Sequence, residues 1–118
     1  MKAVVYTEFG PPEVLHVADV PAPAPKDDEV LVRVHATSVG YGDLLARNFK
    51  AVSGREFNMP LPLLPLQRMV FGFRRPKVNI LGSEFSGEIE AAGAQVTRFQ
   101  VGDQVYGYLG ARMGAYAE

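Results

Sequence analysis

The residues that most often do chemistry are few in this sequence and are poorly placed for it. The chain contains no cysteine, which excludes disulfides, thiolate metal ligands and thiol nucleophiles together. Its two histidines, His16 and His35, each fall in a predicted strand without a partner at metal-ligand spacing. We interpret both as solvated strand residues. Because no acid–base pair such as Tyr–Lys or His–Asp stands in a suitable context, the catalytic residue stays unassigned.

Asp43 is the most suggestive carboxylate. It follows two glycines in the segment SVGYGDLLARNFK, at residues 38–50, and precedes an apolar pattern typical of a short helix. An aspartate at a helix start accepts backbone N–H bonds and stabilises the helix by about 0.5–2 kcal/mol. Asp43 is therefore either a helix cap or part of a functional site, and the two roles are compatible.

The glycine-punctuated stretch at residues 81–107, LGSEFSGEIEAAGAQVTRFQVGDQVYG, predicts the scaffold. Glu88 and Glu90 alternate with Ile89 and Ala91, as expected for a strand with one solvated face. Turns are predicted at residues 92–94 and 102–103, where glycine permits positive φ. Short strands cut by turns at this spacing indicate a small twisted barrel.

Earlier segments fit the same all-β scheme. Strands are predicted over residues 2–6, 14–20 and 29–37, and the last has Val30, Val32, Val34 and Ala36 on one face. Pro21, Pro23 and Pro25 predict an extended connector between the second and third strands.

Residues 51–80 permit three interpretations. Pro60, Pro62 and Pro65 are expected to break regular structure, whereas residues 66–73 are compatible with two helical turns. The first and most favoured interpretation is an apolar insertion, at about residues 50–78, that packs on a neighbouring surface. The second interpretation is a lid over a lipophilic substrate pocket. The least favoured interpretation is an interfacial anchor, with Met69, Phe71 and Phe73 in lipid beside three cations.

Length and composition limit the remaining possibilities. At 118 residues the chain is one domain. Its net charge of −1 provides no overall field that would recruit nucleic acid. The N-terminus lacks a signal-peptide core, and no apolar run approaches the roughly 20 residues needed to cross a bilayer. We expect a cytoplasmic domain. Residues 114–116 look like the start of another strand, so we also expect a truncated chain.

Four stretches in this order carry a resemblance to a known family. They are MKAVVYTEFGPPEVL, the proline run into EVLVRVHATSVGYGD, the stretch at residues 81–107, and GAYAE. Together they resemble the N-terminal, GroES-like catalytic domain of medium-chain dehydrogenases/reductases, and most closely the zinc-independent quinone-oxidoreductase-like members. The resemblance implies a mainly β fold with short helices, in the form of a GroES-like, partly open β-barrel.

The same resemblance locates two positions where zinc-dependent relatives hold metal ligands. Gly40 stands at a cysteine position and Ser83 at a histidine position. Glycine has no donor atom and a serine hydroxyl is a poor zinc ligand, so the resemblance implies no zinc. Glu84 matches the carboxylate that follows the ligand histidine, and we expect it to fix the Gly82 loop by hydrogen bonding, with Arg47 as a partner.

Gly40, Tyr41, Asp43 and Leu45 are the candidates for the substrate and cofactor pocket. Quinone-oxidoreductase relatives typically have asparagine at the position of Gly40 and often tyrosine at that of Leu45. Asp43 matches the family's acidic residue, and Tyr41 beside the missing asparagine supplies a hydroxyl.

The implied reaction is hydride transfer from NADP(H) or NAD(H) to a small lipophilic quinone, enone or carbonyl compound. No G-x-G-x-x-G occurs in the chain, so a Rossmann domain outside these residues is expected to bind most of the cofactor. These 118 residues alone are expected to be inactive, and the full-length protein is expected to be a homodimer.

Two other classes remain open. The chain could be a standalone GroES-like binding or interaction module. It could also be a lipid-surface docking domain that uses the loop at residues 59–73.

Overall fold

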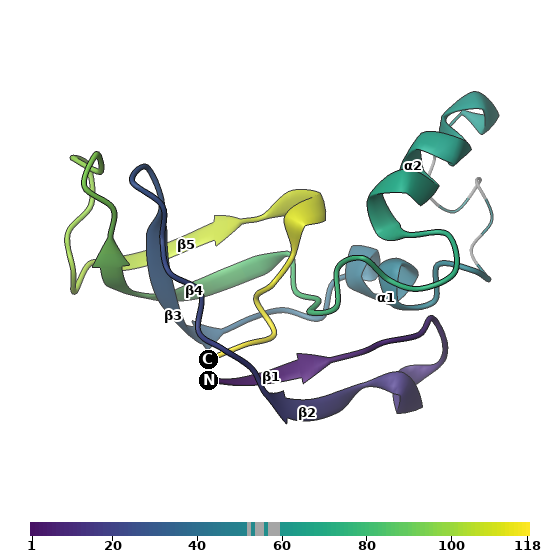
Figure 1. The fold of residues 1–118 in the computed structure, drawn as a ribbon, viewed down its shortest axis with the longest axis horizontal. Helices are drawn as coiled ribbons and strands as arrows, with labels where there is room; N and C mark the ends of the chain where they lie inside the picture. Colours follow the sequence, from purple (N-terminus) through teal and green to yellow (C-terminus); the bar gives the residue numbers. More distant parts are fainter. Residues whose placement is uncertain (52, 54–55, 57–59) are drawn as a thin grey trace.

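The computed structural model describes residues 1–118 except 52, 54–55 and 57–59. Two separate antiparallel sheets form its framework (Figure 1). The first pairs β1 (Lys2–Val5) with β2 (His16–Asp19). The second has the order β3-β4-β5, from Val30–Ala36, Glu84–Ala92 and Gln104–Tyr108. The mainly β, GroES-like prediction is confirmed, and both sheets are open.

Two short helices complete the described part of the chain. Helix α1 covers Tyr41–Arg47 and helix α2 covers Leu64–Phe71. Short 3-10 turns occupy Pro12–Val14, Leu61–Leu63 and Gly110–Arg112. In Figure 1 helix α2 stands away from both sheets, on the far side of α1.

The C-terminal segment closes the framework. Ala117 forms an isolated bridge with Ala3, and the Val4 N–H donates to the Tyr116 carbonyl at 2.8 Å. The Tyr116 N–H donates to the Leu81 carbonyl at 2.9 Å. The two termini therefore lie close together, as Figure 1 shows. Tyr116 packs against a core cluster of Tyr6, Ala46, Leu81 and Met113.

The strand predictions need two corrections. The strand predicted at 14–20 begins only at His16, because Pro12 starts a 3-10 turn that ends at Val14. The predicted inward row of β3 holds for Val30, Val32 and Val34, which are half-buried, but Ala36 is exposed. A register irregularity between Val34 and Ala36 breaks the alternation there.

The prolines of the 51–80 segment do not prevent helix formation. Pro62 lies inside a 3-10 turn and Pro65 lies in the first turn of α2, where a missing N–H costs nothing. The helix ends at Gly72, whose φ is 104°. Part of the predicted insertion, and Met59 of the 59–73 loop, lie outside the described residues.

Candidate functional site

A buried carboxylate lies at the centre of the candidate site. Asp43 is only 1% exposed, although it sits in the first turn of α1. Its Oδ2 accepts the N–H of Gly40 at 2.9 Å, and its Oδ1 accepts the N–H of Gly82 at 3.2 Å. The Tyr116 hydroxyl also donates to Oδ2, at 3.4 Å. One side chain thus joins the start of α1, the loop before β4 and the C-terminal segment.

The capping interpretation of Asp43 is correct in kind but wrong in position. Gly40 is the N-cap of α1, and Asp43 is its third residue. The carboxylate reaches back to the N-cap N–H, as the third residue does in a capping box. Because it also bonds Gly82, 39 residues away, it serves the tertiary structure as well as the helix.

Gly82 has to be glycine in this arrangement. Its φ is +94°, and a Cβ there would lie 2.6 Å from Tyr116 Cδ1 and 2.8 Å from the Tyr116 nitrogen. The missing side chain lets the Gly82 loop and the C-terminal segment meet backbone to backbone. The Ala115 N–H donates to the Gly82 carbonyl at 3.1 Å. The loop before β4 is therefore fixed from two sides.

Tyr116 is the member of the site that sequence reasoning missed. Burial raises the pKa of Tyr116 to about 12, with further contributions from the charge of Asp43 and from the hydrogen bond to it, while Arg47 acts in the opposite direction. Its hydroxyl accordingly stays protonated and acts as a donor near neutral pH. Tyr116 is the tyrosine of the motif GAYAE, which in the sequence indicates only the family and the start of a strand.

The Gly40 and Ser83 positions lie side by side. A Cβ placed on Gly40 would be 3.2 Å from Asp43 Oδ2 and 3.9 Å from Ser83 Oγ. Ser83 is 8% exposed and is therefore a buried polar residue beside Gly40. Within the described part of the chain, no group of three or more histidine, cysteine, aspartate or glutamate residues is placed to hold a metal ion.

The predicted role of Glu84 is wrong. Glu84 is exposed, and its Oε2 accepts the Ser38 hydroxyl at 2.5 Å, whereas Asp43 holds Gly82. The Nε of Arg47 donates to the Gly10 carbonyl at 3.2 Å and not to Glu84. Glu84 begins β4, and the pleat of the strand turns its side chain toward Ser38 and away from the buried Gly82 N–H.

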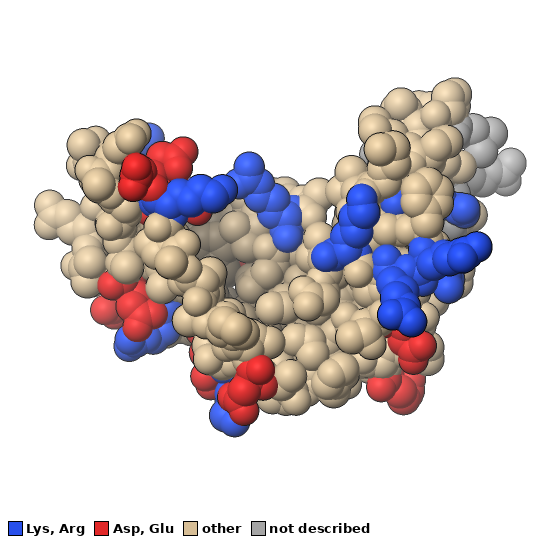
Figure 2. Space-filling model, in the orientation of Figure 1, with Lys and Arg blue, Asp and Glu red and all other residues tan. Residues whose placement is uncertain are grey.

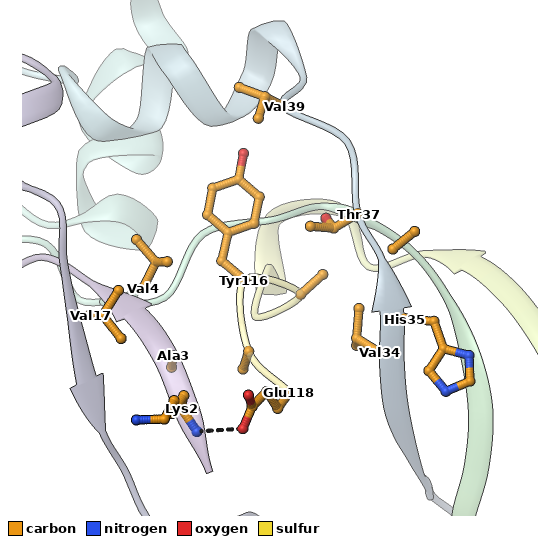
Figure 3. A pocket seen from close by; sticks show the side chains of 13 residues that line it. Lys2, Ala3, Val4, Val17, Val34, His35, Thr37, Val39, Tyr116 and Glu118 are labelled. Carbon is orange, nitrogen blue, oxygen red and sulfur yellow. Dashed lines mark hydrogen bonds between the residues drawn. The ribbon is translucent and has the colours of Figure 1, made fainter.

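An apolar cleft of about 590 Å³ adjoins this centre (Figure 3). Its wall includes Val4, Val17, Val34, Thr37, Val39 and Tyr116. Figure 3 shows the Tyr116 side chain between β1 and β3, with its hydroxyl directed toward Val39. The volume and the mainly apolar lining suit a small lipophilic molecule.

The predicted pocket residues are divided by this geometry. Gly40 and Asp43 do not line the cleft themselves. Val39, which precedes Gly40, and Tyr116, which donates to Asp43, do line it. Tyr41 is 63% exposed and Leu45 is buried, and neither lines the cleft. His35 is exposed on β3 at the cleft wall, as expected of a strand residue in contact with solvent.

Comparison with known proteins reveals clear relatives. Residues 26–118 match the family described as the alcohol dehydrogenase GroES-like domain. A curated quinone oxidoreductase from Pseudomonas aeruginosa is 37% identical over 117 residues, which cover 99% of this chain and 29% of that protein.

Solved structures agree with this relationship. A quinone oxidoreductase from Pseudomonas syringae pv. Tomato DC3000 aligns with a TM-score of 0.70 and 33% identity, over 99% of this chain and 29% of that one. Mycobacterial Rv1454c, solved in complex with NADPH, aligns with a TM-score of 0.63 and 30% identity, over 92% and 27% of the two chains. The chain thus spans about three tenths of the length of the relatives it matches.

Proposed function

This chain belongs to the alcohol dehydrogenase GroES-like domain family, and we propose that it forms the substrate side of an NAD(P)H-dependent reductase of quinones, enones or related carbonyl compounds. The similarity to quinone oxidoreductases over nearly the whole chain supports this class of reaction. The similarity to a relative solved with NADPH supports the choice of cofactor. A cytoplasmic location and a homodimeric full-length protein remain predictions.

The arrangement of Gly40, Ser83 and Asp43 is the observation that supports a zinc-independent reaction. The Gly40 position faces a serine hydroxyl and a carboxylate that is already engaged by three donors. Neither Gly40 nor Ser83 offers the imidazole or thiolate that zinc prefers. We therefore propose a reaction in which zinc takes no part.

The chain's own residues would bind and orient the substrate. When bound, the nicotinamide cofactor supplies the hydride. Val4, Val17 and Val39 line the cleft with apolar side chains, which favours an apolar substrate. Asp43 holds Tyr116 and the Gly82 loop in one geometry, so the wall is pre-organised.

The dinucleotide phosphates do not fit on this chain. It has no glycine-rich phosphate-binding turn, and its described residues contain no βαβ unit. We expect the 118 residues alone neither to bind NADPH at micromolar concentration nor to turn over. Calorimetric titration of the chain with NADPH checks this, and micromolar binding would contradict it.

A substrate panel tests the proposed activity. The protein expressed from its complete reading frame is assayed with quinones, enones and aldehydes, each with NADPH and with NADH. We expect turnover of at least one of these classes. A reading frame that stops after Glu118, together with no turnover, would favour a standalone binding module instead.

A further inference from the structure

The segment from Pro60 to Lys77, here called the arm, is attached to the body through one side of α2. On that side Gln67 is buried and Phe71 is half-buried. The Phe71 ring packs on the Phe49 ring, with centroids 5.3 Å apart. The rest of the helix projects away from the two sheets (Figure 1).

The opposite side of the arm is also apolar. Its exposed side chains are Leu63, Leu66, Met69, Val70 and Phe73, between 44% and 60% accessible. They follow the spacing i, i+3, i+6, i+7 and i+10, which places the helical ones on one face. A helix that packed on the body and otherwise faced water would carry polar residues there. Folding of this chain alone therefore does not explain the stripe.

Basic residues flank the apolar stripe. Arg68, Arg74, Arg75 and Lys77 are all exposed. No aspartate or glutamate occurs between Glu56 and Glu84 in the sequence. The two ion pairs among the described residues, Lys26–Glu29 and Arg33–Glu90, lie elsewhere. Figure 2 shows a gathering of lysine and arginine side chains below the arm.

We propose that the arm docks on a membrane surface that contains anionic phospholipid. The exposed apolar side chains enter the boundary between headgroups and acyl chains, while the arginines pair with headgroup phosphates. Helix α2 has 8 residues, and no helix in the described ranges is long and apolar enough to cross a membrane. The arm therefore lies on the surface.

The alternative of a lid over the substrate pocket is less well supported. The wall of the 590 Å³ cleft is built from residues 2–4, 17, 34–37, 39 and 115–118, and none belongs to the arm. The side chains of the stripe are exposed to solvent, and none of them lines this cleft. An unbalanced positive charge beside a projecting apolar stripe complements an anionic lipid surface better than a neutral substrate.

Vesicle flotation of the 118-residue chain tests the proposal. The vesicles contain either phosphatidylcholine alone or phosphatidylcholine with phosphatidylserine in excess of the protein. We expect binding to the anionic vesicles that weakens with added salt. The double variant Arg74→Gln/Arg75→Gln should weaken it by roughly 20- to 30-fold, since each basic side chain near such a surface strengthens binding about five-fold.

Two further variants separate the arm from the rest of the surface. Met69→Ser/Phe73→Ser should abolish binding, and its unchanged thermal unfolding would show that the fold is intact. Tyr106→Ser/Tyr108→Ser is the matched control, because both tyrosines are exposed on β5. This control should bind like the parent chain.

Three results would overturn the proposal. They are no binding to anionic vesicles, equal and salt-insensitive binding to both vesicle types, or an equal loss in the Tyr106/Tyr108 control. If the arm variants leave vesicle binding unchanged but lower turnover of the complete protein, the arm is a substrate lid instead.

Discussion

The segments around Asp43 and the arm are held to the rest of the domain by different interactions. Asp43 ties together three segments separated by up to 73 residues, through hydrogen bonds to two backbone N–H groups and one phenol. The arm rests on ring packing and on a buried glutamine, and it exposes most of its apolar side chains. The difference is that polar bonds fix the segments around Asp43 from several sides, whereas the arm leaves most of its apolar side chains in contact with solvent.

The largest effect is expected from Asp43→Ala. Two backbone N–H groups and the Tyr116 hydroxyl would lose their acceptor, one of them in a buried loop. We expect the free energy of unfolding to fall by roughly 3–5 kcal/mol, measured by urea denaturation. Asp43→Asn keeps one oxygen acceptor and should cost less. A loss below about 1 kcal/mol for the alanine variant would show that Asp43 does not hold these segments together.

Gly82→Ala should come next. The substitution combines a positive φ with a Cβ less than 3 Å from Tyr116, so we expect a loss of roughly 2–4 kcal/mol. Gly102→Ala is the matched control, since Gly102 has the same φ of +94° with nothing within 4 Å. The control should show only the backbone strain, about 1–2 kcal/mol. Equal losses in the two variants would mean that the contact with Tyr116 is unimportant.

Tyr116→Phe should have a smaller effect that depends on pH. Its hydrogen bond to Asp43 contributes about 1 kcal/mol. The folded-state pKa of Tyr116 is about 12 against an ordinary value of 10, so the folded state holds this proton more tightly. That stabilisation is complete below pH 10 and is lost as pH rises from 10 to 12.

Denaturation curves between pH 9 and pH 12 check this prediction. The variant should lose stability less steeply than the parent chain over the upper part of the range. Some pH dependence should remain in the variant, because burial also raises the pKa of Tyr6 to about 12. Identical pH profiles in parent and variant would contradict the role given to Tyr116.

The smallest effect is expected from a substitution of Gln67, the buried residue of α2. Gln67 is 4% exposed, and its Oε1 is buried without a hydrogen-bond partner among the described residues. Gln67→Leu removes this unpaired acceptor, so we expect a gain of up to about 1 kcal/mol, measured as a higher Tm. Gln67→Glu is the opposite control and should lower Tm. A destabilised leucine variant would indicate that the amide has a structural role.

Much of the framework could be predicted because its signals are local. The alternation around Ile89 and the turn at Gly102 depend only on neighbouring residues. The Asp43–Tyr116 contact joins residues that are 73 positions apart, and no local sequence pattern predicts it. The resemblance to the family predicts that Glu84 holds the Gly82 loop, but its carboxylate accepts the Ser38 hydroxyl instead.

The helix of the arm illustrates a second limit. The prolines were expected to break regular structure, yet proline fits the first turn of a helix without loss of a hydrogen bond. Its effect therefore depends on where the helix begins.

Metal dependence of turnover tests the central claim most directly. The protein from its complete reading frame is assayed for NADPH-dependent quinone reduction before and after dialysis against a zinc chelator, with metal analysis of both samples. Because Gly40 and Ser83 lack zinc-binding donors, we predict equal turnover in the two samples and no bound zinc. Activity that disappears on dialysis and returns with added zinc would contradict the account.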